Sequence, residues 1–469
     1  MSEYTEVEQP FLQQLETLGW TAIDQGPDIP HDPEKSLRQT FRQWILPEVF
    51  AKAVSVINKT STGESWLTEK QLHDLHDQIL RQPNRTLLEA NEAVQKLLFK
   101  AQVDVNETIG ESNPVVKLID FANPENNRFH AINQFRIDTP GCVKQFIIPD
   151  IVLFVNGIPL AVVECKKGGP TCANPMNEAF EQLQRYMNRR DATRQQGLKE
   201  GEPRLFHPVL FLIRTCGLEA DFGTITSGIE HFFPWKTQWS QDDKTADGMN
   251  QQQQLIAGML NKRNLLHILR TSSVFMDTDS GPRIKVVCRY QQFRAAGKIC
   301  DRLRNGKTQA DKCGVVWHTQ GSGKSLTMVF VARMLRASQD LSDFKIVLVN
   351  DRTDLETQLG RTATLIGGRV NIIESTNDLR GQLSTDSSDI NMVMVHKFQQ
   401  REQSLSLKVA EALGTYQAMP SGKSFGVVNE SERIILMIDE AHRTQGSELG
   451  ENIFEASQMP CGSRSPARR

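Results

Sequence analysis

The sequence contains no run of eighteen consecutive apolar residues, and its opening, MSEYTEVEQPFLQQLETLGW, lacks a basic segment followed by an apolar core. A membrane-spanning helix needs about twenty mostly apolar residues, and a secretory signal needs both of those segments. We therefore expect a protein that neither enters a membrane nor is exported.

Closely spaced cysteine pairs are also absent. The eight cysteines include no CxxC pair and no spacing typical of a metal finger. Such a pattern is typical of free thiols in a reducing compartment. The sequence therefore predicts a cytoplasmic location.

The chain has no excess of charge of either sign. Its 54 basic and 56 acidic residues leave a net charge of -2, so contact with a polyanion must be local rather than driven by an overall field. At 469 residues the chain is too long for a single hydrophobic core. We expect two or three domains.

The spacing of apolar residues changes along the chain. Steps of three and four predict an opening helix with Phe11 and Leu15 on one face, and further helices over about 35–58 and 67–100. From about residue 115 the pattern becomes that of strands. We expect a mixed sheet with flanking helices, built from strands at 115–121, 130–137, 146–155, 158–165 and 207–215 and a helix at 174–190.

A second α/β segment follows a polar connection at 239–254. A strand at 314–319, a Gly-rich turn, a helix at 325–337 and a strand at 345–350 alternate there, which predicts a parallel sheet. The expected domains are 1–240, a linker with connecting helices at 241–284, a second domain at 285–457 and a disordered tail at 458–469.

Asp150, Glu164 and Lys166 form the pattern PD…ExK on two adjacent predicted strands. Two carboxylates can share Mg²⁺, while a lysine can position or activate water and neutralise charge on a scissile phosphate. A lone ExK near a strand end more often consists of solvated edge residues. Here, apolar strand residues and an upstream Pro-Asp surround it, which favours a metal-dependent site.

The geometry of the intervening hairpin tests this interpretation. Asn156-Gly157 predicts a tight turn, but a two-residue loop would pair Asp150 with Val163 and send Glu164 to the other face. A three-residue loop would place Asp150 opposite Glu164, with Lys166 on the same side. We therefore expect the longer loop, or an equivalent bulge.

Gln182 and Tyr186 follow on a predicted helix, where a spacing of four places them on one face. The alternative interpretation is that these two residues have a purely structural role on the helix. Together with the PD…ExK trio, this QxxxY pattern resembles the PD-(D/E)xK nuclease domain of type I restriction R subunits. The resemblance implies that Gln182 and Tyr186 support the metal site and DNA. Glu8, in an opening similar to the family's first helix, would add an acidic group.

The segment His318-Thr-Gln-Gly-Ser-Gly-Lys-Ser325 lies between a predicted strand and a predicted helix, as a phosphate-binding loop must. Backbone N–H groups there would point at phosphate oxygens, Lys324 would reach the β- and γ-phosphates, and Ser325 would bind Mg²⁺. The first position is His rather than Gly, a form that resembles the loop of R subunits within superfamily 2 helicases. The predicted ATP contacts are Thr319, Gln320, Gly321, Ser322, Gly323, Lys324 and Ser325.

Asp439 and Glu440 begin a DEAH motif directly after the apolar segment RIILMI. Asp439 can hold Mg²⁺ through water, and Glu440 can polarise the water that attacks ATP. Segments 349–358 and 395–398 resemble helicase motifs that touch the DNA backbone. Gln292 resembles the residue of the family that reads adenine. The motifs together predict one RecA-like ATPase domain with a parallel sheet.

The final residues, 458–469, have no periodicity and are basic and polar. These residues can be written as codons that, when read in a frame displaced by one base, translate as PNAVRIAFTGTP. That translated segment resembles the next helicase motif of the family. We therefore hypothesise a single-base deletion at the codon for Ser457. A chain with one RecA-like domain would lack the second domain's arginine and is expected to be a defective motor.

The resemblance implies an ATP-dependent DNA translocase and endonuclease subunit that uses ATP and Mg²⁺ to cleave unmodified foreign DNA. Its partners would be double-stranded DNA and the methylase and specificity subunits of a restriction complex. The alternative is a non-motor, DNA- or partner-binding fragment of a damaged gene. A stand-alone repair helicase is disfavoured, because such helicases do not usually carry this nuclease domain.

Overall fold

The structure is a computed structural model, and it describes residues 2–170, 172–190, 195–236, 248–278, 281–317, 323–350, 370–373, 376–394, 429 and 431–438. The chain divides into two compact units. The first comprises Met1–Phe275 and Ile284–Tyr290, and the second comprises Met276–Arg283 and Gln291–Arg469. The first unit therefore includes much of the segment that was expected to be a linker.

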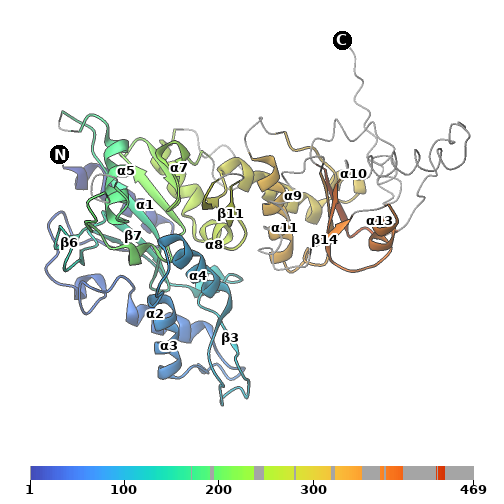
Figure 1. Ribbon diagram of the computed structural model, residues 1–469, viewed down its shortest axis with the longest axis horizontal. Helices are drawn as coiled ribbons and strands as arrows, with labels where there is room; N and C mark the ends of the chain where they lie inside the picture. Colours follow the sequence, from blue (N-terminus) through green and yellow to red (C-terminus); the bar gives the residue numbers. More distant parts are fainter. Residues whose placement is uncertain are drawn as a thin grey trace, which may run out of the picture. The chain divides into compact units, whose positions relative to one another are not determined.

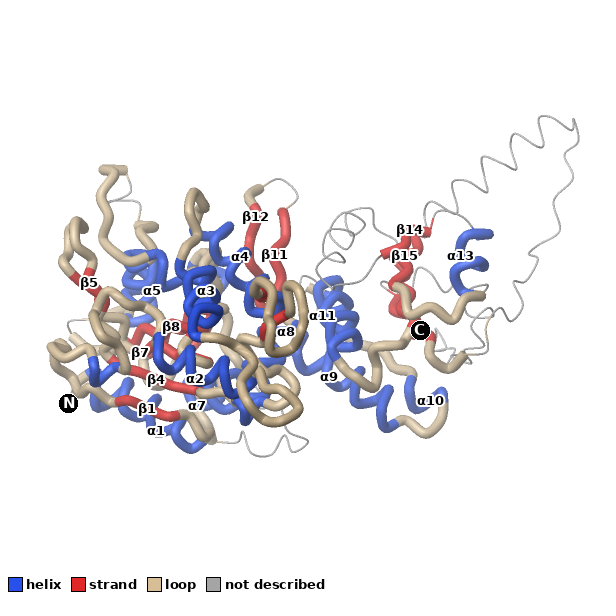
Figure 2. Tube along the Cα trace, turned by 90° about the horizontal axis from the view of Figure 1, so that it is seen from below, coloured by secondary structure: helices blue, strands red, loops and turns tan. Residues whose placement is uncertain are grey.

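A six-stranded mixed sheet forms the centre of the first unit, in the order β1-β4-β7-β8-β9-β10. β1 is parallel to β4, β8 is parallel to β9, and the other neighbouring pairs are antiparallel. Figure 2 shows β1, β4, β7 and β8 side by side. The strands are β1 (Thr21–Ile23), β4 (Phe129–Asn133), β7 (Ile151–Val155), β8 (Ile158–Cys165), β9 (Phe211–Thr215) and β10 (Ala220–Gly223).

The central strands β7, β8 and β9 are buried along their whole length. Continuous apolar runs, rather than alternating ones, are typical of strands covered on both faces. The mixed α/β architecture predicted for this part is confirmed. Two short pairs complete its strands: β2 (Ala101–Gln102) with β3 (Val115–Val116), and β5 (Ile137–Asp138) with β6 (Phe146–Ile147). A further pair is β11 (Ser273–Asp277) with β12 (Arg283–Val287).

Helices α1, α5 and α7 of the first unit lie beside this sheet, whereas α2, α3 and α4 lie together (Figure 1). The α5 helix packs on β8 and β9, whereas α7 packs on β10 and on α1. The helices are η1 (Tyr4–Glu8), α1 (Gln9–Thr17), η2 (Glu34–Ser36), α2 (Pro47–Ile57), α3 (Glu69–Leu80), α4 (Leu87–Lys100), η3 (Pro124–Asn126), α5 (Pro175–Tyr186), η4 (Pro203–Phe206), η5 (Ile229–His231), α7 (Gln251–Met259) and α8 (Lys262–Thr271).

Two of the predicted helices are shorter or divided. The helix expected over 35–58 begins only at Pro47, since proline suits the first helical turn. The helix expected over 67–100 is two helices, because Pro83 and the left-handed Asn84 interrupt it. Capping boxes at Thr68 and Thr86 start the separate helices α3 and α4.

Asn91 on α4 is the centre of a buried polar network in the first unit. Its Nδ2 donates to the backbone oxygens of Phe206, His207 and Val209 at 2.8–2.9 Å, and its Oδ1 accepts from Lys285 Nζ at 2.8 Å. Burial lowers the pKa of Lys285 well below its usual value. The network ties α4, β12 and the segment before β9 together.

A parallel sheet in the order β14-β15-β13-β16 forms the described centre of the second unit. Val347, Val393, Ile373 and Leu383 pack in one apolar cluster, so α13 covers one face of this sheet. The elements are α9 (Tyr290–Asn305), α10 (Gln309–Lys312), α11 (Lys324–Ala337), β13 (Lys345–Asn350), β14 (Val370–Ile373), α13 (Thr376–Leu383), β15 (Ile390–Met394) and β16 (Ile434–Ile438).

The parallel sheet of the second unit, the helix at 325–337 and the strand at 345–350 were predicted correctly. The strand expected at 314–319 is wrong for its described part, because residues 314–317 form no strand. Val315 and Trp317 are each 90% exposed. An apolar pattern alone does not make a strand without a neighbour to accept its backbone hydrogen bonds.

Candidate functional site

The β7–β8 hairpin positions the predicted carboxylates. Its turn has two residues, Asn156 and Gly157, with φ of 51° and 77°, as a type I′ turn requires. The register then shifts: Phe154 pairs with Pro159, but Leu153 pairs with Ala161. The three-residue loop was therefore a wrong prediction, and the alternative of an equivalent bulge is confirmed.

The bulge at Leu160 determines which residues face each other beyond it. One extra residue in β8 moves every following pair by one position, so Ile151 pairs with Val163 and Asp150 comes opposite Glu164. Without the bulge, Asp150 would face Val163 and Glu164 would point to the opposite side of the sheet. The local distortion thus brings the two carboxylates together.

The tight turn is held from outside the hairpin. Asn156 Nδ2 donates to Leu118 O and to Asn127 Oδ1, both at 2.8 Å. Gly157 O accepts from Leu46 N at 2.9 Å, directly before α2. A Cβ at Gly157 would lie 2.5 Å from Leu46 O, so the approach requires glycine.

Lys166 links the two carboxylates across the hairpin. Its Nζ lies 2.8 Å from Glu164 Oε1 and 3.4 Å from Asp150 Oδ2, and it donates to Cys165 O at 2.6 Å. Asp150 Oδ2 also accepts from Cys165 N at 2.7 Å. The structure therefore brings the predicted trio together in one buried cluster.

Burial and the neighbouring charges together set the pKa values in this cluster. It raises the pKa of Asp150, and it raises the pKa of Glu164 well above its usual value, with a further increase from the charge of Asp150. Burial by itself would lower the pKa of Lys166, but the charges of Glu164 and Asp150 outweigh it and raise that pKa. The two carboxylates therefore favour the charged form of Lys166.

Glu3, Glu8 and Asp150 together form a cluster of carboxylates, called the acidic group below. Carboxylate oxygens of Glu3, Glu8 and Asp150 lie within 4.8 Å of one another. Burial and the charge of Asp150 raise the pKa of Glu8 to about 7. The Oε2 atom of Glu164 is buried and has no hydrogen-bond partner among the described residues. Several close carboxylate oxygens are the donor set that a divalent cation prefers.

Glu3 was missed from the sequence, and local helix geometry explains why. Residues five apart lie on different faces of an α-helix, but η1 (Tyr4–Glu8) is π-helical and bonds residues five apart. This brings Glu3 toward Glu8. Glu3 also lies 3.5 Å from Lys166 Nζ and accepts from Lys167 N at 2.9 Å, so it ties the N-terminal segment to the end of β8.

Gln182 and Tyr186 share one face of α5, as predicted. Gln182 Nε2 donates to Tyr186 Oη at 2.9 Å, and Tyr186 Oη donates to Ile148 O at 2.8 Å, two residues before Asp150. Burial, with the charges of Glu164 and Asp150, raises the pKa of Tyr186 well above its usual value. The pair thus braces the backbone that leads into Asp150, and its contact with DNA stays a prediction.

Of the predicted phosphate-binding loop, the structure describes the C-terminal end, from Gly323 onward. Lys324 and Ser325 begin α11, directly after the left-handed Gly323 at φ 76°. The buried Gln292 donates from Nε2 to Gly323 O at 3.0 Å, so α9 supports the end of the loop. The following predicted residues and segments lie outside the described residues: His318, Thr319, Gln320, Gly321, Ser322, Asp439, Glu440, 351–358 and 395–398.

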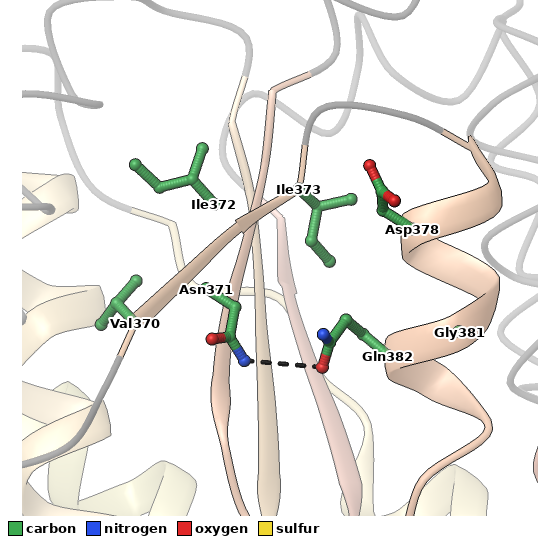
Figure 3. A pocket seen from close by; sticks show the side chains of 7 residues that line it. All are labelled: Val370, Asn371, Ile372, Ile373, Asp378, Gly381 and Gln382. Atoms are coloured by element: carbon green, nitrogen blue, oxygen red, sulfur yellow. Dashed lines mark hydrogen bonds between the residues drawn. The ribbon is translucent and has the colours of Figure 1, made fainter.

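An open pocket between β14 and α13 contains none of the predicted site residues (Figure 3). Asn371 and Gln382 make a long contact of 3.5 Å across it.

Among the described residues, no helix is both long and apolar enough to cross a membrane.

Comparison with known proteins identifies the family. Residues 1–241 match the family described as type I restriction enzyme R protein N terminus, which is more than half of the 469 residues. The chain belongs to this family. Residues 291–461 match the family described as SWI2/SNF2 ATPase. The two matches favour an R subunit over a non-motor fragment.

Similar curated proteins agree. The chain is 29% identical over 460 residues to the type I restriction enzyme HindI endonuclease subunit of Haemophilus influenzae, covering 95% of this chain and 39% of that protein. It is 26% identical over 471 residues to the putative type I restriction enzyme MjaIXP endonuclease subunit of Methanocaldococcus jannaschii, covering 96% and 41%. The chain thus spans about two-fifths of the length of these relatives.

Proposed function

We propose that the chain is the part of a restriction R subunit that combines a PD-(D/E)xK nuclease domain with a RecA-like ATPase domain. The complete protein would move along double-stranded DNA at the expense of ATP and cleave unmodified foreign DNA. It would do so in a complex with methylase and specificity subunits. The observation that carries this proposal is the bulged hairpin, which sets Asp150 opposite Glu164 with Lys166 between them.

Asp150 and Glu164 would hold Mg²⁺, with Glu8 and Glu3 as further oxygen donors beside Asp150. When bound, Mg²⁺ would supply Lewis-acid stabilisation of charge at the scissile phosphate. Burial and the neighbouring carboxylates raise the pKa values of these groups, and a bound cation would favour their ionised forms.

Lys166 has a distinct part in the proposed chemistry. Its Nζ lies 2.8 Å from Glu164 Oε1 and 3.4 Å from Asp150 Oδ2, beside both proposed metal ligands. Its ammonium group can orient a water molecule and offset the negative charge that develops on the phosphate. Gln182 and Tyr186 would keep the chain before Asp150 in place through the hydrogen bond to Ile148 O.

For the ATPase domain, we propose that Lys324 contacts the β- and γ-phosphates and that Ser325 and Asp439 hold Mg²⁺. Glu440 would polarise the attacking water, and Gln292 would read adenine. The start of α11 at Lys324 supports the phosphate contacts, since the free N–H groups of a helix N-terminus attract phosphate.

An Asp150→Asn variant tests the nuclease assignment. The substitution keeps the size of the side chain and removes its charge, so Mg²⁺-dependent cleavage should be lost in a complex assembled with a full-length R subunit, DNA and ATP. Asp138→Asn is a suitable control, because Asp138 pairs with Arg136 at 2.9 Å and lies outside the acidic group. Cleavage at the parental rate by Asp150→Asn would reject the proposed site.

A further inference from the structure

Gln134 stands directly after β4 in an unusual backbone conformation. Its φ is 45°, in the left-handed region that glycine and asparagine adopt more readily. The conformation turns its N–H group toward Asp150 O, which accepts at 2.7 Å, and the next residue, Phe135, donates to Pro149 O at 2.9 Å. The turn is thereby joined to the segment that carries Asp150.

The side chain of Gln134 reaches the other half of the acidic group. Its Nε2 donates to both Oε1 and Oε2 of Glu8, each at 3.1 Å. Glu8 is 2% exposed, so water offers it few alternative donors. Asn133 Nδ2 adds only a long contact of 3.5 Å to Oε2. Gln134 is thus the main donor among the described residues that fixes the orientation of this carboxylate.

The turn itself is braced from a second segment. Gln25 Nε2 donates to Asn133 O at 2.7 Å and to Gln134 O at 3.2 Å, and Gln25 N donates to Asn133 Oδ1 at 2.7 Å. When the surroundings of a residue hold its backbone in a rarely populated conformation, a functional role is worth looking for.

An amide suits this role for a chemical reason. A carboxylate has about four lone-pair sites, and two hydrogen bonds leave others open for a cation. A lysine at this position would neutralise Glu8 and compete with a metal ion. An uncharged donor orients Glu8 without removing its charge.

We propose that Gln134 is a positioning residue that holds the Glu8 carboxylate beside Asp150 to receive a divalent cation. This inference rests on the proposed metal-dependent nuclease site. Gln134 acts through Glu8 with its side chain, while its backbone N–H group keeps the Asp150 segment adjacent.

The test measures binding of Mn²⁺ alone to the full chain by electron paramagnetic resonance, without nucleotide or DNA. Gln134→Met keeps the length of the side chain and removes the donor. Partners that orient metal ligands typically contribute about 10- to 100-fold in affinity, so Mn²⁺ binding should weaken by about that factor. Gln78→Met is the control, because Gln78 lies on α3 and, among the described residues, its side-chain amide donates to Gln102 O rather than to a carboxylate of the acidic group.

Gln134→Gly ensures that the test does not depend on folding of the Met variant. Glycine adopts φ of 45° readily and also lacks the amide, so it should show the same loss of Mn²⁺ affinity. In a Glu8→Gln background, Gln134→Met should change affinity by no more than about twofold, because the residue through which it acts has lost its charge.

The outcomes separate this inference from the nuclease proposal. The parent chain must bind Mn²⁺ in a way that Asp150→Asn abolishes. If it does not, the proposed metal site is wrong and the role of Gln134 fails with it. If Asp150-dependent binding is present but Gln134→Met and Gln134→Gly bind as the parent does, only the inference is overturned. An equal loss in the parent and Glu8→Gln backgrounds would also overturn it, since Gln134 would then act independently of Glu8.

Discussion

Replacing Gly157 by alanine tests how closely the β7–β8 turn approaches α2. Gly157 has φ of 77°, and an alanine Cβ would meet Leu46 O at 2.5 Å and Phe50 N at 2.9 Å. A left-handed conformation destabilises a residue with a Cβ by roughly 1–2 kcal/mol. Overpacking against backbone atoms adds about 1–3 kcal/mol. Alanine also makes the unfolded chain less flexible than glycine does, which offsets about 0.4–1 kcal/mol of this destabilisation.

Gly26 supplies a matched control for the backbone contribution. Its φ is also 77°, but a Cβ there would meet nothing within 4 Å. Gly26→Ala should therefore lower the free energy of unfolding by roughly 1 kcal/mol. Gly157→Ala should lower it by roughly 3 kcal/mol. The difference isolates the close contact with α2.

Thermal unfolding of both variants beside the parent measures this difference. For a domain of this size, each 1 kcal/mol shifts the midpoint by about 2–4 °C, so we expect a decrease of roughly 6–12 °C for Gly157→Ala and about 4 °C or less for Gly26→Ala. Hydrogen exchange of peptides covering 151–165 assigns the transition to the first unit. Equal shifts in the two variants would refute the reasoning.

Three further predictions concern other parts of the chain. Burial lowers the pKa of His207 from 6.5 to about 4, so the stability linked to its neutral form is complete above pH 6.5 and is lost as the pH falls toward 4. His207→Phe should flatten this slope in unfolding midpoints measured across that range, and an unchanged slope would contradict the assignment. Asn91→Leu should lower the free energy of unfolding by about 3 kcal/mol, because it removes the Asn91 donor from Phe206 O and His207 O and leaves Lys285 Nζ with Val209 O as its remaining acceptor among the described residues. Denaturant titration would measure this, and a loss below about 1 kcal/mol would count against it. Lys324→Ala should abolish ATP binding in a fluorescent-nucleotide titration, and parental affinity would exclude the phosphate contact.

The pairing of Asp150 with Glu164 could be predicted from the sequence because strand periodicity restricts which side chains share a face. The means of achieving it could not. Whether one extra residue sits in the turn or in a bulge depends on how Asn156-Gly157 packs against α2, which lies far away in the sequence.

The acidic group beside Asp150 was only partly predictable. Glu8 followed from the resemblance of the opening helix, but Glu3 joins it through a π-helical turn that ordinary helical periodicity does not reveal. The contact between Gln134 and Glu8 spans 126 positions and carries no local sequence signal. By contrast, the break between α3 and α4 was visible as Pro83 and could have been predicted.

Cleavage by two adjacent lysine variants tests the central claim most directly. Lys166 Nζ lies 2.8 Å from Glu164 Oε1, whereas Lys167 Nζ pairs with Glu6 at 2.7 Å. Each is replaced by methionine in a full-length R subunit, and the assembled complex is assayed for Mg²⁺-dependent DNA cleavage, with ATP hydrolysis measured in the same samples. Lys166→Met should reduce cleavage by roughly 100-fold or more while ATP hydrolysis stays at the parental rate, and Lys167→Met should cleave nearly as the parent does. Parental cleavage by Lys166→Met, or an equal loss in both variants, would contradict the assignment of the bulged hairpin as the nuclease centre.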